Sequence, residues 1–247
     1  MSKVLVSETH LNDIANAIRN KNGATDKYKP SQMASAIESI SSGGSSGGNV
    51  EDTLYKMLSN TLTEYSNDEI TELPAYAFRG CTNLVSVSFP NCIYIGQSAF
   101  QITGNVGKDN LASVNMLKLK QIGATGFYGC AKLTELTFPY LQHINATAFS
   151  GCSGLTKLDL GLNNDDILNT YFSSNAFKDC TSLVALILRK TNQIYTLQNT
   201  NALTNTPIVN GTGYIYVPQA LLETYKTASN WSTYANQIVA IEGSEYE

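Results

Sequence analysis

One short sequence pattern recurs along this chain and limits its fold more than any other feature. Four segments align without gaps, and each has a Cys three residues after a Phe, a Leu six residues after it and apolar residues nine and eleven after it. The four segments begin at Ala77, Gly126, Ala148 and Ala176. A further copy opens at Ala99 with a short insert and no Cys, and a degenerate one begins at Ala202.

This spacing predicts a coil of stacked units. The Leu-x-x-Leu-x-Leu part places alternate apolar side chains on one face of a short strand. One unit of about 22 residues cannot bury its apolar face alone, so the copies must stack on one another. The sequence therefore predicts a repeat solenoid of about five to six coils, with one strand per coil in a parallel sheet.

Four of the five cysteines, Cys81, Cys130, Cys152 and Cys180, occupy the same position of the repeat. A free Cys at a core position behaves as a small apolar residue, so we expect reduced thiols that point inward. A metal site would need ligands at short spacing, which these residues lack. A disulfide between stacked copies is the alternative. Cys92 lies outside the column and is also predicted to be a packing residue.

The pattern Ala-Phe-x-x-Cys-x-x-Leu-x-x-Leu/Val-x-Leu/Phe-Pro resembles the BspA-like leucine-rich repeats of gut and mouth bacteria and their prophages. The resemblance covers roughly residues 70–218 and implies a leucine-rich-repeat fold. Pro90 and Pro139 match the Pro that ends the strand in this family. Gly161 and Arg189 stand at that position in two other copies and depart from the family pattern.

The segments on either side of the repeat have different patterns. Residues 1–40 predict a helical hairpin, residues 41–49 form a Gly/Ser linker of natural or engineered origin, and residues 50–69 are expected to cap the solenoid of residues 70–213. Residues 214–247 predict an α/β cap at the other end. Trp231 in that cap is expected in the core, although a Trp could also serve as a sugar-stacking platform.

The predicted hairpin resembles short N-terminal modules in virion proteins of phages that infect Firmicutes. That resemblance implies attachment to other virion proteins. The attachment residues would be the apolar positions of the two helices, Leu11, Ile14, Ile18, Met33 and Ile37. The alternative is a helical cap of the solenoid, which a flexible linker would serve badly.

Composition and motif content exclude several functions. The net charge of −4 and the lack of a basic run argue against a nucleic-acid partner. No apolar run is long enough for a membrane span or a signal peptide, so we expect a chain made in the cytoplasm without membrane insertion. His10 and His143 have no Ser, Cys or carboxylate at a motif spacing. We therefore predict no enzyme activity, no cofactor and no metal site.

The candidate binding residues are the outward positions of the predicted strands, which form an exposed strip with Tyr140 nearby. This strip is small, polar and mixed in charge, and it suits weak multivalent contact with a glycan or cell-surface protein. A rigid spacer without a ligand is the alternative. The outward positions are Ser86, Ser88, Ser113, Asn115, Glu135, Thr137, Lys157, Asp159 and Ile187.

Together these features predict a homo-oligomeric phage or prophage protein on the virion surface, in a tail, fibre or head decoration. The hairpin would anchor it, and the solenoid would display a face for a host-surface glycan or protein. Two alternatives remain at this point: a bacterial BspA-like adhesin that binds host proteins, and a purely structural virion component.

Overall fold

The computed structural model describes residues 61–102, 109–161 and 170–247, and the fold is given for these residues. The chain divides into two compact units, Met1–Leu62 and Thr63–Glu247. The account below concerns the second unit. Several predictions lie outside the described residues: the hairpin 1–40, the linker 41–49, most of the cap 50–69, and the attachment residues Leu11, Ile14, Ile18, Met33 and Ile37.

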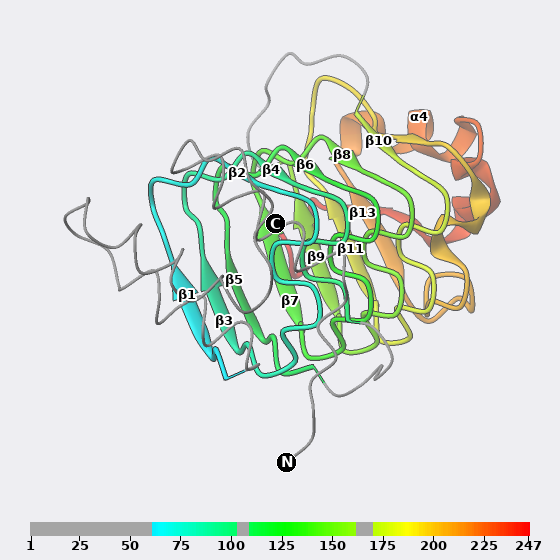
Figure 1. Ribbon diagram of the computed structural model, residues 1–247. Helices are drawn as coiled ribbons and strands as arrows, with labels where there is room; N and C mark the ends of the chain where they lie inside the picture. The colour runs from blue at the N-terminus through cyan, green and yellow to red at the C-terminus, as the bar shows by residue number, and fades with distance from the viewer. Residues whose placement is uncertain (1–60, 103–108, 162–169) are drawn as a thin grey trace, which may run out of the picture. The chain divides into compact units, whose positions relative to one another are not determined.

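The second unit is a coil in which every complete copy of the repeat contributes two strands, one to a front row and one to a side sheet (Figure 1). The front row comprises β1 (Glu64–Ser66), β3 (Ser86–Ser88), β5 (Ser113–Asn115), β7 (Glu135–Phe138), β9 (Lys157–Leu160), β11 (Ala185–Leu188), β13 (Tyr214–Val217) and β14 (Ile238–Ala240). The side sheet comprises β2 (Glu72–Leu73), β4 (Tyr94–Ile95), β6 (Gln121–Ile122), β8 (His143–Ile144), β10 (Tyr171–Phe172) and β12 (Thr196–Leu197).

All paired strands run parallel, which confirms the predicted solenoid. The prediction of one strand per coil is wrong in number. Each strand of the side sheet has only two residues, one buried apolar and one directed outward, as in β4 with Ile95 and Tyr94. Two residues suffice because the coils are already stacked at the spacing that strand pairing requires.

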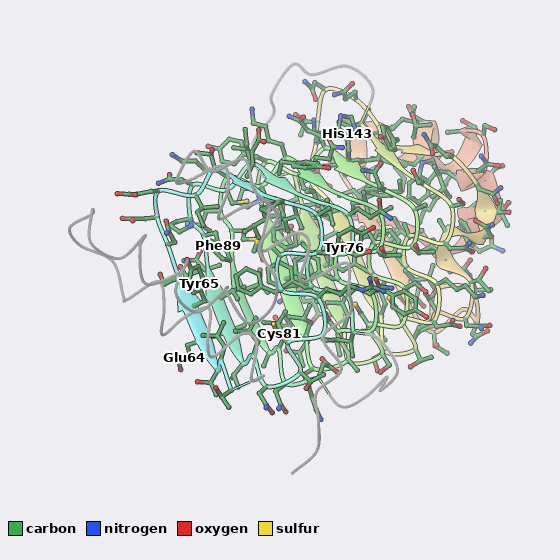
Figure 2. All side chains as sticks on the ribbon, in the orientation of Figure 1. Glu64, Tyr65, Tyr76, Cys81, Phe89 and His143 are labelled. Atoms are coloured by element: carbon green, nitrogen blue, oxygen red, sulfur yellow. The ribbon has the colours of Figure 1, made fainter. Side chains whose placement is uncertain are left out.

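A column of stacked phenylalanines fills the interior. The rings of Phe78, Phe100, Phe127, Phe149 and Phe177 follow one another with centroids 5.3, 5.1, 5.4 and 5.9 Å apart and planes within 10° of parallel. Such distances are typical of favourable offset stacking. Phe89 and Cys81 are also buried, whereas Glu64 points outward from β1 (Figure 2).

The turn that carries each Phe is held by backbone hydrogen bonds to the next coil. The amides of Thr125, Phe127 and Gly129 donate to the carbonyls of Ala146, Ala148 and Ser150, at 3.0, 2.8 and 2.9 Å. Two positions of this turn have positive φ. The residue before Ala-Phe or Gly-Phe has φ between 55° and 65°, and the residue before each of the four repeat cysteines has φ between 60° and 78°. The latter residue is Gly80, Gly129, Gly151 or Asp179, and it makes the turn.

The front row is interrupted between β5 and β7. β1, β3 and β5 form one sheet, and β7, β9, β11, β13 and β14 form another, while the side sheet continues across the same boundary. Beside this break, the Lys132 amide donates to the buried carboxylate of Asp109 at 3.1 Å. Val114 of β5 is half-buried, whereas Val87 and Leu136 at the same repeat position are buried. Val114, next to the break, is therefore partly in contact with solvent.

The solenoid ends with η3 (Thr200–Leu203), and the C-terminal cap contains η4 (Gln219–Leu221), α4 (Leu222–Thr227) and η5 (Trp231–Gln237), in addition to β13 and β14. Trp231 is buried, and its Nε1 donates to the carbonyl of Tyr195 at 2.6 Å, which confirms its core position. β1 and β13 pair with the strands of the repeat, so the ladder extends beyond residues 70–213 at both ends. Within the described residues, no helix is long and apolar enough to cross a membrane.

The five cysteines are free and buried, as predicted. The thiols of Cys130, Cys152 and Cys180 donate to the carbonyls of Phe100, Phe127 and Phe149, at 3.3, 3.1 and 3.1 Å. Burial raises the pKa of the Cys81 thiol to about 11 and that of Cys180 to about 12. It also raises the pKa of Cys130 and Cys152 well above the ordinary value of 9.0. These thiols therefore stay protonated at neutral pH.

The phenylalanine column predicts a large loss of stability when it is interrupted. Phe149→Ala would remove one ring from between two others and leave a cavity, so we expect the free energy of unfolding to fall by about 3–5 kcal/mol. Urea unfolding followed by Trp231 fluorescence measures this loss. Phe149→Leu keeps most of the volume and should lose less. Equal losses for the two variants would contradict the role of the stacked rings.

The raised pKa of Cys180 predicts a decline of stability at high pH. Below pH 9.0 the thiol is protonated in both states, whereas between pH 9.0 and about 12 the unfolded chain loses its proton first. The free energy of unfolding therefore falls as pH rises through this window, by at most about 1.4 kcal/mol per pH unit for one thiol. Urea unfolding from pH 8 to 11 should show a shallower decline for Cys180→Ala than for the unmodified chain. Parallel declines would contradict the prediction.

Candidate functional site

The outward side chains of the front row fall into two columns. Within each of its two sheets the strands pair without offset, and the repeat alignment relates β5 of the first sheet to β7 of the second. Along the chain their character changes from small and polar to charged and then to apolar. The first column is Glu64, Ser86, Ser113, Glu135, Lys157, Ala185 and Tyr214. The second is Ser66, Ser88, Asn115, Thr137, Asp159, Ile187 and Tyr216.

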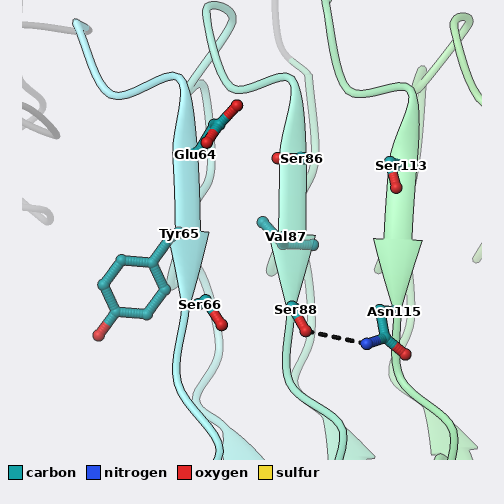
Figure 3. Close-up of a pocket in the computed structure, with 8 residues that line it drawn as sticks. All are labelled: Glu64, Tyr65, Ser66, Ser86, Val87, Ser88, Ser113 and Asn115. Carbon is teal, nitrogen blue, oxygen red and sulfur yellow. Dashed lines mark hydrogen bonds between the residues drawn. The ribbon is translucent and has the colours of Figure 1, made fainter.

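A shallow depression of about 430 Å³ lies over β1, β3 and β5. Figure 3 shows its polar side chains in two rows that cross the three strands. We call these six residues the polar strip: Glu64, Ser66, Ser86, Ser88, Ser113 and Asn115. The structure thus brings together four residues predicted from the sequence and adds Glu64 and Ser66, which precede the first copy recognised in the sequence. The signal for them was Tyr65, an apolar residue between two polar ones.

Within the polar strip, most hydrogen-bonding groups face solvent. Asn115 Nδ2 donates to Ser88 Oγ at 2.9 Å (Figure 3). Among the described residues, the hydroxyls of Ser66, Ser86 and Ser113 have no hydrogen-bond partner. A hydroxyl can both donate and accept, so this surface can form hydrogen bonds with a polar ligand without first breaking bonds within the protein.

The predicted residues of β7 and β9 form the charged part of the front row. Lys157 Nζ lies 2.5 Å from Glu135 Oε2, and both side chains contact solvent. Thr137 is exposed beside them. Tyr140 follows β7 in a turn, half-buried, and does not belong to either column. In this part of the predicted strip Glu135 and Thr137 are exposed, whereas Lys157 is half-buried.

Two predicted strip residues, Asp159 and Ile187, are not exposed. Asp159 is 8% exposed and Ile187 is fully buried, as is Ala185 at the neighbouring outward position. The cause is the end of the chain, because Ile241 packs on Ala185 and Ile187, together with the half-buried Tyr216 and Tyr246. The strip available to a ligand is therefore shorter than the sequence indicates.

Arg189 connects this cover to the front row. Its Nε and Nη2 donate to the two carboxylate oxygens of Asp159 at 2.8 and 3.0 Å, and Nη2 also donates to the carbonyl of Tyr246 at 2.9 Å. Arg189 was not among the predicted site residues. Its signal in the sequence is that it stands where Pro90 and Pro139 end other strands.

His143 lies on the side sheet, where its ring is 4.5 Å from that of Tyr171. Burial and the nearby Lys190 lower the pKa of His143. In the part of the chain that the structure describes, no group of three or more His, Cys, Asp or Glu could hold a metal ion. The polar strip provides hydroxyl, amide and carboxylate groups suited to hydrogen bonding.

Comparison with known proteins identifies the repeat. The family model described as BspA type leucine rich repeat region, in six copies, matches residues 49–111 and 106–217, more than half of the chain. A search of curated proteins found no match.

Two solved structures are similar. A leucine rich cell surface protein from Faecalibacterium prausnitzii A2-165 is 23% identical with a TM-score of 0.50. The match covers 63% of this chain and 39% of that protein, so the chain spans well under half of its length. The leucine rich repeat protein of Treponema pallidum is 21% identical with a TM-score of 0.41, and the match covers 70% of this chain and 85% of that one. At this level of identity the first match supports the fold alone.

The two ion pairs of the front row should differ in their contribution to stability. Asp159→Ala leaves the Arg189 guanidinium without its carboxylate in a mostly buried place. We expect the free energy of unfolding to fall by about 2–3 kcal/mol, less than for a fully buried pair. Glu135→Ala breaks a pair that water already solvates, so the change should stay within about 1 kcal/mol. Urea unfolding tests both variants, and a larger loss for Glu135→Ala would contradict the assignment.

Proposed function

The chain belongs to the BspA-type leucine-rich-repeat family, and from this we propose that it is an adhesion module on the surface of a phage virion. Its polar strip would bind a hydroxyl-rich ligand, a glycan of the host cell surface. The binding would be non-enzymatic and would need no cofactor. Other virion proteins would hold the molecule through its N-terminal segment.

The observation that carries the ligand class is the set of solvent-facing hydroxyls on β1, β3 and β5. They recur from strand to strand at a spacing of about 4.8 Å, so a polymer with repeated hydroxyl groups can bond to several strands in turn. Each bond contributes little net free energy, about 1 kcal/mol, because it replaces bonds to water. Useful affinity then requires many copies that bind together.

Attachment to a particle would supply those copies. The apolar positions of residues 1–40 suit attachment, and the segment resembles modules of virion proteins. Homo-oligomers on a virion would present many polar strips to one cell. A bacterial adhesin that binds host proteins and a structural virion component without a ligand are the alternatives that the test must separate.

The test displays the biotinylated full chain on streptavidin beads and measures binding to purified cell-wall polysaccharides of Gram-positive bacteria and to purified animal matrix proteins. We expect binding to at least one polysaccharide. Ser113→Arg places a long charged side chain over the polar strip and should weaken this binding at least tenfold. Thr196→Arg makes a comparable change at an exposed position of the side sheet and should leave binding unchanged.

Three outcomes would contradict the proposal. Binding to matrix proteins alone would favour the bacterial adhesin, and no binding by the multivalent form would favour a rigid spacer. Equal losses for the two Arg variants would place the ligand elsewhere. The virion location is tested separately by mass spectrometry of purified phage particles, in which the absence of the chain would contradict attachment.

A further inference from the structure

The last residues of the chain cover part of the front row with a compact turn, here called the tail segment (residues 241–247). Ile241 continues the strand ladder, because its amide donates to the carbonyl of Val217 at 2.9 Å. The chain then turns at Gly243, where φ is 79°. The Ser244 amide donates to the carbonyl of Ile241 at 2.9 Å, and the Gly243 amide donates to a carboxylate oxygen of Glu247 at 2.9 Å. The tail segment thus stabilises its own shape.

Only a few groups of the tail segment touch the surface beneath it. The Ile241 side chain packs on Ala185 and Ile187. The Tyr246 ring meets the Tyr216 ring edge-on, with centroids 4.7 Å apart. The remaining side chains of the segment are exposed or face solvent in part. The apolar contact therefore depends on one aliphatic and one aromatic side chain. In addition, the Gln219 amide donates to a carboxylate oxygen of Glu242 at 2.8 Å.

A further polar contact, from Arg189, helps to hold the turn in position. Arg189 holds Asp159 through two hydrogen bonds and still directs an N–H group of Nη2 to the carbonyl of Tyr246. The ion pair orients the guanidinium, so this donor is in place before any peptide group arrives. In the structure, the Arg189 N–H group donates to a backbone carbonyl, that of Tyr246.

We propose that the surface formed by Ala185, Ile187, Tyr216 and Arg189 is a peptide-binding site, with the tail segment as its resident occupant. Its partner is a peptide turn of another protein that presents an aliphatic side chain, an aromatic side chain and a backbone carbonyl. This ligand class differs from that of the polar strip. The proposal therefore goes beyond the proposed function and does not depend on glycan binding.

Tethering determines when the site is open. A segment joined to the site by a short connection has an effective concentration in the millimolar range. A free peptide with the same contacts therefore competes poorly while the tail segment is intact. A partner binds only where it displaces the tail segment, so the tail segment restricts access to the site.

Saturation-transfer NMR tests the site with a synthetic peptide of residues 240–247 added to the full chain. Tyr246→Ala removes the aromatic contact of the resident segment, so this variant should bind the peptide at least tenfold more tightly than the unmodified chain. Adding Ile187→Arg to Tyr246→Ala should abolish binding, because the charge replaces a buried apolar contact. Tyr128→Ala is the matched control on the turn side of the coil and should behave like the unmodified chain.

A second variant tests the site without placing a charge in the apolar contact, as Ile187→Arg does. Arg189→Lys keeps the positive charge beside Asp159 but lacks the planar fork that also reaches Tyr246, so it should weaken peptide binding when combined with Tyr246→Ala. Trp231 fluorescence checks that each variant is folded. The proposal is overturned if the peptide binds the unmodified chain and Tyr246→Ala equally, or if it binds neither of them.

Discussion

Contact between each coil and the next is the constraint on which the rest of the structure depends. The amides of one turn donate to the carbonyls of the following turn, and the phenylalanine rings stack in the same direction. These bonds hold non-glycine residues such as Thr125 and Thr147 at positive φ, a conformation that costs such residues about 1–2 kcal/mol. The local strain is offset because each inner coil pairs with a neighbour on both sides. The same stacking brings the outward residues of the front row into register.

The sequence predicts the parts of the fold that repeat, because repetition makes a weak local signal visible several times. The buried cysteines and the outward serines of β3 and β5 follow from the repeat spacing. The side sheet is not visible, because a two-residue strand has no periodicity. The burial of Asp159 and Ile187 depends on a segment far along the chain, and no local pattern reveals it. The break in the front row between β5 and β7 occurs at one pair of coils only, so the repeat pattern does not predict it.

The front row has a hydroxyl-rich region and an apolar region, with charged residues between them. Hydroxyl groups dominate β1, β3 and β5, whereas Ala185, Ile187 and Tyr216 make the outward side of β11 and β13 apolar. Asp159 and Arg189 lie at the boundary. An apolar surface of this kind would be an aggregation hazard if it were uncovered, since solvent-exposed apolar strands favour association. The tail segment covers it, and the solenoid can then expose its polar strip without exposing this patch.

The column of buried thiols determines how the molecule responds to its redox surroundings. Oxidation and disulfide exchange need a thiolate that solvent can reach. Cys130, Cys152 and Cys180 are buried, and burial raises the pKa of their thiols, so these thiols are neither ionised at neutral pH nor accessible. While the chain stays folded, these three thiols are therefore shielded from cross-linking in an oxidising medium as well as in a reducing one.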